Sequence, residues 1–164
     1  AAAEGADLDA VESAARTAIP RGHAFIVVHR LDNLRRSGRI GTTASWLGTA
    51  LSLKPLLCLD RDGKLVLSQR IRTASKARAA LVDQVAEVIG DRRAAVVVHH
   101  VDNHHAADEL GAALTARLPQ LQSVSVTDMG PVLAVHVGSG AVGVAISVDE
   151  SSPPSGQLAT GTAV

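Results

Sequence analysis

Apolar and polar positions along the chain follow two periods, one typical of helices and one typical of strands. Apolar residues recur every three or four positions across residues 7–19, with Asp7 available as an N-cap, so this segment predicts a helix. The apolar run at 23–29 predicts a strand. The polar segment after it predicts a short helix at 31–36, and the apolar spacing within 42–52 predicts another helix.

A β-hairpin is the clearest local signal in the chain. Two apolar runs, residues 53–60 and 64–71, are separated by Arg61, Asp62 and Gly63. An Asp-Gly pair favours the positive φ angles of a tight turn. The two runs are therefore expected to pair as antiparallel strands.

The second half of the chain predicts a β-α-β unit. A strand of the buried type at 94–101 is followed by a helix at 104–118 and a strand at 121–128. Asp102 or Asn103 is expected to cap the helix, because both side chains can accept hydrogen bonds from the first backbone amides.

The elements combine into one predicted α/β fold, a mixed β-sheet flanked by helices. A long helix at 73–89 and a final strand at 142–149 complete it. The length of 164 residues and the mass of 16.9 kDa fit a single domain. We expect an N-terminal helix and linker at 1–20, the domain itself at 21–150, and a disordered tail rich in Ser, Gly and Pro at 151–164.

Composition and charge exclude several classes of function. Sixteen basic residues balance sixteen acidic ones, so no global field attracts nucleic acid or an anionic membrane. Phe25 and Trp46 are the aromatic residues, too few for a surface that stacks RNA bases. The single cysteine, Cys58, excludes an intramolecular disulfide and fits a reducing, cytoplasmic setting. No apolar run approaches the roughly 20 residues of a membrane span, so we expect no stable membrane insertion.

A cluster of four histidines, His99, His100, His104 and His105, raises the alternative of a metal-dependent hydrolase. The expected geometry argues against it. His99 and His100 point to opposite sides of a strand, and the other two lie about 100° apart around a helix. The simpler interpretation places His100 near a crevice at the carboxyl end of the strand and the other three in solvent.

Residues 138–143 read GSGAVG and match the dinucleotide-binding pattern G-x-G-x-x-G. That pattern requires a helix that opens at the glycines, whereas a strand is expected here, so nucleotide binding is disfavoured. A glycine turn whose amides face an anion remains open. His136, within the apolar segment 131–137, is either a core histidine or a hydrogen-bond donor to a carboxylate in an apolar cavity.

Two groups of arginines stand in polar surroundings. The first comprises Arg35, Arg36 and Arg39, and the second comprises Arg70 and Arg72. They form either a solvated face or a docking surface for an acidic partner, because guanidinium groups pair with carboxylates and phosphates through two hydrogen bonds.

Four segments, in order, resemble the C-terminal half of DegV family proteins: LRRSGRIG, LGTALSLKPLLCLDRDGKL, RIRTASKA and GPVLAVHVGSGAVGVAI. The resemblance covers about residues 5–149. It implies the C-terminal domain of a two-domain fold that buries one long-chain fatty acid in a tunnel between its domains, with no other cofactor. In many bacteria such a protein is the non-catalytic subunit of fatty acid kinase, and an ATP-binding partner subunit phosphorylates the acyl carboxylate.

The resemblance also assigns roles to residues. His136 maps onto the histidine that holds the carboxylate, followed by Gly138 and Gly140, although Ser139 replaces the usual proline between these glycines. The acyl chain is expected to contact Leu47, Leu51 and Leu133, and the kinase subunit to contact Arg39 and Arg72. The first domain of the family has no counterpart in these 164 residues, so we expect half of a site, presented as an open apolar groove.

Overall fold

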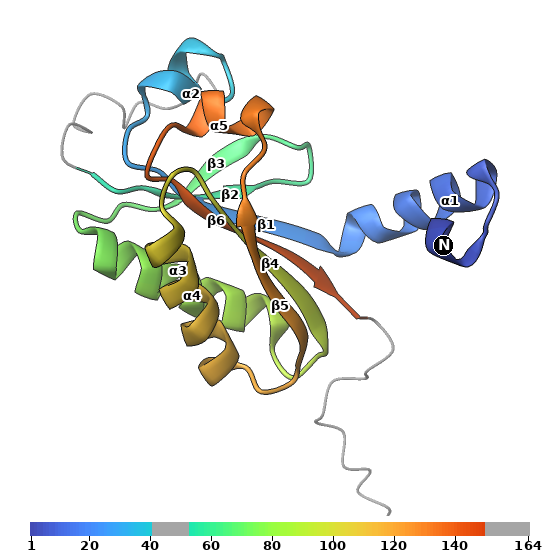
Figure 1. Cartoon of the computed structure of the whole chain (residues 1–164). Coiled ribbons are helices and arrows are strands. Elements are labelled where there is room, and N and C mark those ends of the chain that lie inside the picture. Colours follow the sequence, from blue (N-terminus) through green and yellow to red (C-terminus); the bar gives the residue numbers. More distant parts are fainter. Residues whose placement is uncertain (41–52, 150–164) are drawn as a thin grey trace, which may run out of the picture.

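A six-stranded mixed sheet forms the centre of the computed structural model, which describes residues 1–40 and 53–149 (Figure 1). The strands are β1 (Gly22–Val27), β2 (Leu56–Leu59), β3 (Leu65–Gln69), β4 (Ala94–His100), β5 (Leu121–Asp128) and β6 (Val142–Val148). They lie in the order β3-β2-β1-β6-β4-β5. The neighbours β4 and β5 are parallel and the other neighbouring pairs are antiparallel, which confirms the predicted mixed sheet.

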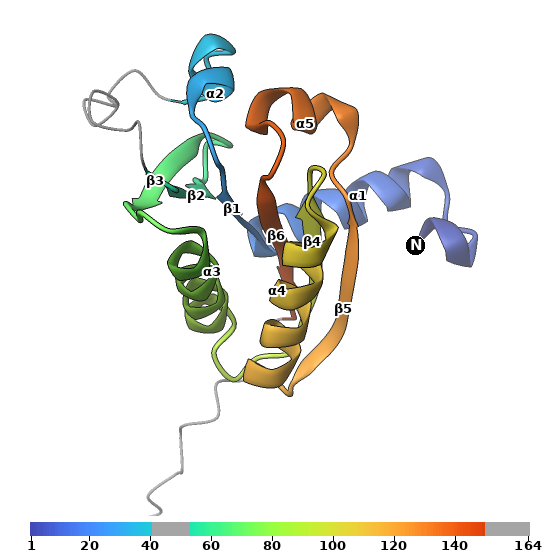
Figure 2. The same ribbon diagram turned by 60° about the vertical axis from the view of Figure 1, so that its left-hand side comes forward.

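Helices cover the two faces of the sheet unequally. They are α1 (Leu8–Ala18), α2 (Asp32–Arg36), α3 (Ala74–Ile89), α4 (His104–Arg117) and α5 (Pro131–Val137), with 3-10 turns at Ala2–Glu4 and Ile19–Arg21. Figure 2 shows α3 and α4 side by side against one face, whereas α2 and α5 lie together beyond one end of the sheet. Among the described residues, 1–40 and 53–149, no helix lies over much of the opposite face.

The main core lies between the sheet and the pair α3 and α4. Leu81 and Val85 of α3 are fully buried against Val96, Val98 and Val144. The buried residues of α3 recur every four positions, so they form one stripe that faces the sheet. A smaller cluster beneath α2 and α5 fixes their end of the sheet.

The hairpin and the β-α-β unit are confirmed. β2 and β3 pair antiparallel, and Gly63 in the turn between them has a φ of +75°. β4, α4 and β5 follow in order, with the two strands parallel. Asn103 does stand at the N-cap of α4, but the expected side-chain cap is wrong, because its amide bonds elsewhere.

Two expectations fall outside the described residues. The helix at 42–52, with Leu47 and Leu51, and the disordered tail at 151–164 cannot be compared with the structure.

The segment Pro131–Val137, which carried no predicted element, is a helix that begins after Gly130 and ends at Gly138. The predicted boundary near residue 20 stays a prediction.

The helix α1 extends away from the sheet, and none of its residues is buried (Figure 1). Asp7 caps it as expected, since its carboxylate accepts a hydrogen bond from the Ala10 amide at 2.9 Å. Within residues 1–40 and 53–149, no helix has both the length and the hydropathy required to cross a membrane.

Candidate functional site

The face of the sheet opposite α3 and α4 is made of small residues at its centre. In β6 the large residues face α3 and α4, and Gly143 and Ala145 alternate with them on the other side. Ala145 lies between Ala24 of β1 and Val97 of β4 in the register. We call Ala24, Gly143 and Ala145 the floor of the site. A shallow apolar depression results, because small side chains stand between larger ones on both sides.

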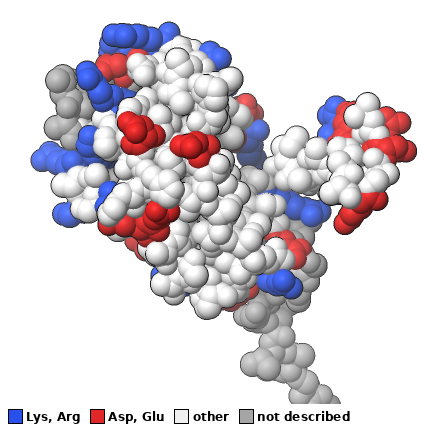
Figure 3. All heavy atoms as spheres, in the orientation of Figure 1, with Lys and Arg blue, Asp and Glu red and all other residues white. Residues whose placement is uncertain are grey.

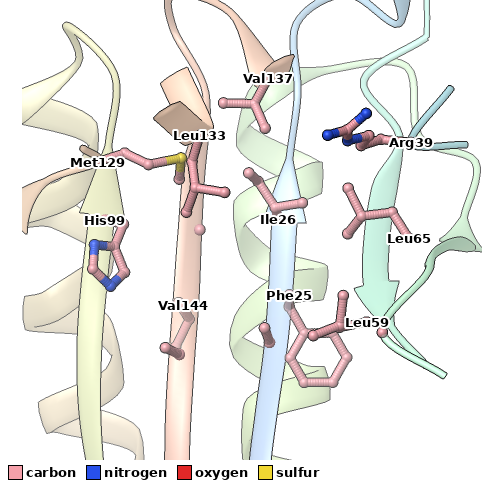
Figure 4. Close-up of a pocket in the computed structure, with 14 residues that line it drawn as sticks. Phe25, Ile26, Arg39, Leu59, Leu65, His99, Met129, Leu133, Val137 and Val144 are labelled. Carbon is pink, nitrogen blue, oxygen red and sulfur yellow. The ribbon is translucent and has the colours of Figure 1, made fainter. Parts of the chain in front are cut away.

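A pocket of about 340 Å³ lies over this floor (Figure 4). Leu59 and Leu65 of the hairpin line one side, and Leu133 and Val137 of α5 lie above. Apart from Arg39 and His99, the residues that line it are apolar. The pocket can therefore bury hydrocarbon with little polar recognition.

The two polar lining residues stand on opposite sides of the pocket. Figure 4 shows His99 on β4 at one side and Arg39 beside Leu65 at the other, across the central strands. The Arg39 guanidinium also donates to the carbonyl of Ser37 at 2.8 Å. An anionic group bound in the apolar pocket would thus find a positive charge at the Arg39 side.

The helix α5 carries His136 between two residues that line the pocket. Leu133 and Val137 are four residues apart and line the pocket from one face of the helix. His136 is three residues after Leu133, so it stands beside that face, half-buried and not itself among the residues that line the pocket. Its contact with a carboxylate stays a prediction.

The glycine turn after α5, defined as Gly138–Gly140, depends on glycine at both ends. Gly138 has a φ of +80° and Gly140 a φ of +84°. The Gly138 N–H donates to the carbonyl of Ala134, and the Gly140 N–H donates to the carbonyl of Val101, both at 2.8 Å. Both amides already donate hydrogen bonds within the fold. These glycines would therefore shape the turn beside a ligand and would not donate a hydrogen bond to it. Direct ligand contact by either glycine stays a prediction.

The four histidines of the cluster are not brought together as ligands. His99 and His100 do point to opposite faces of β4, but the expectation that His99 is in solvent is wrong, because it is half-buried and lines the pocket. His104 and His105 are exposed, as expected. Within the part of the chain that the structure describes, no three His, Cys, Asp or Glu side chains form a group that could hold a metal ion. The metal-dependent hydrolase therefore has no candidate site there.

The buried histidine, His100, has a structural environment of its own. The residue is 4% exposed, and its Nδ1 lies 3.4 Å from the amide nitrogen of Asn103 and 3.4 Å from Oδ1 of Asp128. The ring therefore lies against the turn between β4 and α4.

The two arginines assigned to a partner do not form one patch. Arg39 lies near the start of β3, because the adjacent Ile40 forms a β-bridge with Leu65, whereas Arg72 follows the other end of that strand. Both are exposed. In Figure 3 basic side chains gather around the end of the molecule where α2 lies, and that helix carries Arg35 and Arg36.

His29 lies against the glycine turn from the β1 side. A Cβ built on Gly140 would stand 2.6 Å from the His29 Nδ1. Partial burial, and then the positive charges of Lys54 and Arg78, lower the pKa of His29 from its usual value. His29 is therefore held in its neutral form beside the turn.

Protonation of His29 is expected to weaken the fold as the pH falls. A histidine whose folded pKa lies below the unfolded value of 6.5 binds fewer protons in the folded state, so its contribution is lost as the pH falls through 6.5. Urea unfolding at about pH 7.5 and about pH 5.5 measures this loss. His29→Gln should reduce the difference between the two conditions, and an equal difference in the variant would contradict the assignment.

The floor of the pocket was not predicted, although the sequence of β6 contains a pattern that indicates it. Residues 142–148 read VGVAISV, in which large and small side chains alternate with period two. Such a strand has one face built for a core and one face left shallow. The family resemblance assigned Arg39 to a partner surface. Its position at the pocket depends on the path of the chain after α2, which no local pattern predicts.

Comparisons with known proteins agree on one family. A family model described as "Uncharacterised protein, DegV family COG1307" matches residues 1–149. DegV domain-containing protein Rv2417c of Mycobacterium tuberculosis is 58% identical over 153 residues, which are 93% of this chain and 54% of that relative. The chain thus spans about half the length of the relatives that it matches.

Two crystal structures share the fold. The DegV family protein Cg2579 of Corynebacterium glutamicum has a TM-score of 0.79 and 30% identity, with 92% of this chain and 57% of that chain covered. The protein SAG1342 of Streptococcus agalactiae, described as a fatty acid binding DegV family protein, has a TM-score of 0.77 and 29% identity, with 89% and 51% covered.

Proposed function

This chain belongs to the DegV family, and from that premise we propose that it supplies half of a binding site for a long-chain fatty acid. The similar protein SAG1342 is described as fatty acid binding. The other half of the site would come from a first domain. The chain covers only about half of the length of its relatives, which leaves enough residues in them for such a domain.

The observation that carries this proposal is the apolar pocket on the face of the sheet opposite α3 and α4. An apolar depression of about 340 Å³ that the described residues leave open to solvent is typical of a surface that another group covers. Each methylene of an acyl chain buried there contributes about 0.8 kcal/mol, so a flexible chain needs no further recognition along its length. The floor of small residues gives such a chain a track across the central strands.

The carboxylate of the fatty acid would bind beside α5. His136 would donate a hydrogen bond to it, and Arg39 would supply a positive charge at the same pocket. Leu133, which lines the pocket, would contact the methylenes nearest to the carboxylate. In this arrangement the chain holds and presents the carboxylate, and the protein is a binding subunit rather than a catalyst.

The proposed partner is an ATP-binding kinase subunit that phosphorylates the presented carboxylate in the cytoplasm. The exposed Arg72, at the far end of β3 from Arg39, supports a contact with an acidic surface on that subunit. Arg39 would then lie between ligand and partner, because it is exposed and lines the pocket at the same time.

The test is the lipid content of the full-length product of the gene, expressed in bacteria and purified without detergent. We expect mass spectrometry of the extract to find about one acyl chain per protein, and His136→Ala to weaken retention roughly tenfold, as for a lost hydrogen bond to a charged group. His104→Ala is the control, because His104 is exposed on α4. An empty full-length protein would overturn the proposal.

A further inference from the structure

The turn between β4 and α4 departs from local preference at two adjacent residues. Asp102 has a φ of 50°, and among the described residues it is the non-glycine residue with a positive φ. Asn103 stands at the N-cap of α4, but its side chain makes no capping hydrogen bond, although such a cap stabilises a helix by about 1 kcal/mol. Strain of this kind persists only where the surroundings hold it, and it clusters at functional sites.

Both departures are explained by contacts with the glycine turn that follows α5. The Gly140 N–H donates to the carbonyl of Val101 at 2.8 Å, which extends the ladder between β4 and β6 beyond its last strand pair. The side-chain amide of Asn103 then donates to the carbonyl of Gly140 at 2.9 Å. The Ser139 hydroxyl lies 3.4 Å from the Asp102 carboxylate. The side chain that would cap α4 holds the glycine turn instead.

The glycine turn is also held from the opposite side. His29, which follows β1, lies so close to Gly140 that a Cβ there would be 2.6 Å from its Nδ1. Asn103 is itself fixed, because its backbone amide lies 3.4 Å from the Nδ1 of the buried His100. The turn is therefore clamped between two strands that flank β6.

From these contacts we infer that Asn103 is a positioning residue for His136. The inference rests on the proposed function, in which His136 holds the carboxylate of a fatty acid. Asn103 contacts the turn and not the pocket, so it acts by fixing where α5 ends. The Gly138 N–H bonds to Ala134 inside α5, and this joins the turn to the helix that carries His136.

The decisive substitution is Asn103→Asp in the full-length protein. Aspartate has the size of asparagine and caps helices equally well, so α4 is not weakened. It lacks the amide donor, however, and places a carboxylate oxygen against the carbonyl of Gly140. We expect the affinity for a long-chain fatty acid, measured with palmitate, to fall roughly tenfold, as for the loss of one hydrogen bond.

A double-mutant cycle separates positioning from a general loss of stability. If Asn103 acts through His136, the combination of Asn103→Asp with His136→Ala should bind palmitate no more weakly than His136→Ala alone. Thr73→Ala is the control, because it removes a helix cap on α3 that is remote from the glycine turn. Its effect on binding should be small and should multiply with that of His136→Ala.

The imidazole resonances of His136 in ligand-free protein give a readout that does not depend on lipid. We expect Asn103→Asp to shift them and Thr73→Ala to leave them in place. Palmitate binding that is unchanged in Asn103→Asp, or losses that multiply in the cycle, would overturn the inference and leave the proposed function standing. A protein that binds no palmitate would overturn the proposed function, and the resonances would then decide alone whether Asn103 positions His136.

Discussion

Ala145→Leu is expected to remove long acyl chains from the pocket while it leaves the sheet intact. Ala145 lies at the centre of the floor, between Ala24 and Val97, on the face of the sheet opposite α3 and α4. The isobutyl side chain of leucine would point into the space that the acyl chain needs. If it displaces three methylenes, binding weakens by about 2.4 kcal/mol, or roughly fiftyfold.

The measurement is the amount and length of acyl chain retained by the full-length protein. Ala95→Leu is the matched control, because Ala95 points to the same face of the sheet but does not line the pocket. We expect the control to retain the wild-type lipid and Ala145→Leu to retain little, with a shift towards shorter chains. Equal retention of long chains by both variants would mean that the acyl chain does not cross Ala145.

Local patterns were enough to predict the elements whose contacts are close in sequence. The hairpin follows from Asp62 and Gly63, because the turn alone brings its two strands together. The helix α3 follows from one apolar stripe and a threonine at its start. In both cases the information lies within about 16 residues, so no knowledge of the remaining fold is needed.

The helix α5 could not be predicted in this way because its sequence favours another structure. Pro131–Val137 has three valines in seven residues, a composition typical of strands. Proline at the first turn and Gly138 at the end permit a helix, and its contact with α2 then fixes it. A segment this short is helical because of its packing, which the sequence does not display.

The site was predicted in part, and the missing part depends on register. The family motif assigns both His136 and Leu133 to the site; Leu133 does line the pocket, whereas the role of His136 stays a prediction. The floor appears only when Gly143 is placed opposite Ile26 and His99, which are 117 and 44 residues away along the chain. Contacts of that separation leave no local pattern, although the alternation within β6 hints at a shallow face.

The histidine cluster was also misjudged from sequence, because the positions of its side chains depend on the fold. Four imidazoles close in sequence suggested metal ligands, but the strand directs His99 into the pocket and His100 towards the helices. His100 then contacts the turn that holds Gly140, through Asn103. Proximity along the chain was therefore a poor guide to chemistry, whereas the two faces of β4 gave each residue a separate role.

Gly140→Ala is expected to be the most destabilising single methyl addition at a glycine of the described chain. The φ of +84° disfavours any side chain by about 1–2 kcal/mol. The new Cβ would also lie 2.6 Å from Nδ1 and 2.9 Å from Cε1 of His29, and forcing an extra methyl group into a packed site costs a further 1–3 kcal/mol, roughly. Urea unfolding should therefore show a loss of about 3 kcal/mol.

Two comparisons divide that loss between backbone and packing. Gly38→Ala is the matched control, because Gly38 has a φ of +66° and no heavy atom within 4 Å of a built Cβ, so it should show only the backbone part, about 1–2 kcal/mol. Combining Gly140→Ala with His29→Ala removes the overlapping ring, so the effect of the glycine substitution should shrink to that of the control. If Gly140→Ala is as destabilising without the imidazole as with it, His29 does not hold the turn. The clamp around Gly140 then reduces to two hydrogen bonds, one from the Gly140 N–H to the carbonyl of Val101 and one from the Asn103 amide to the carbonyl of Gly140.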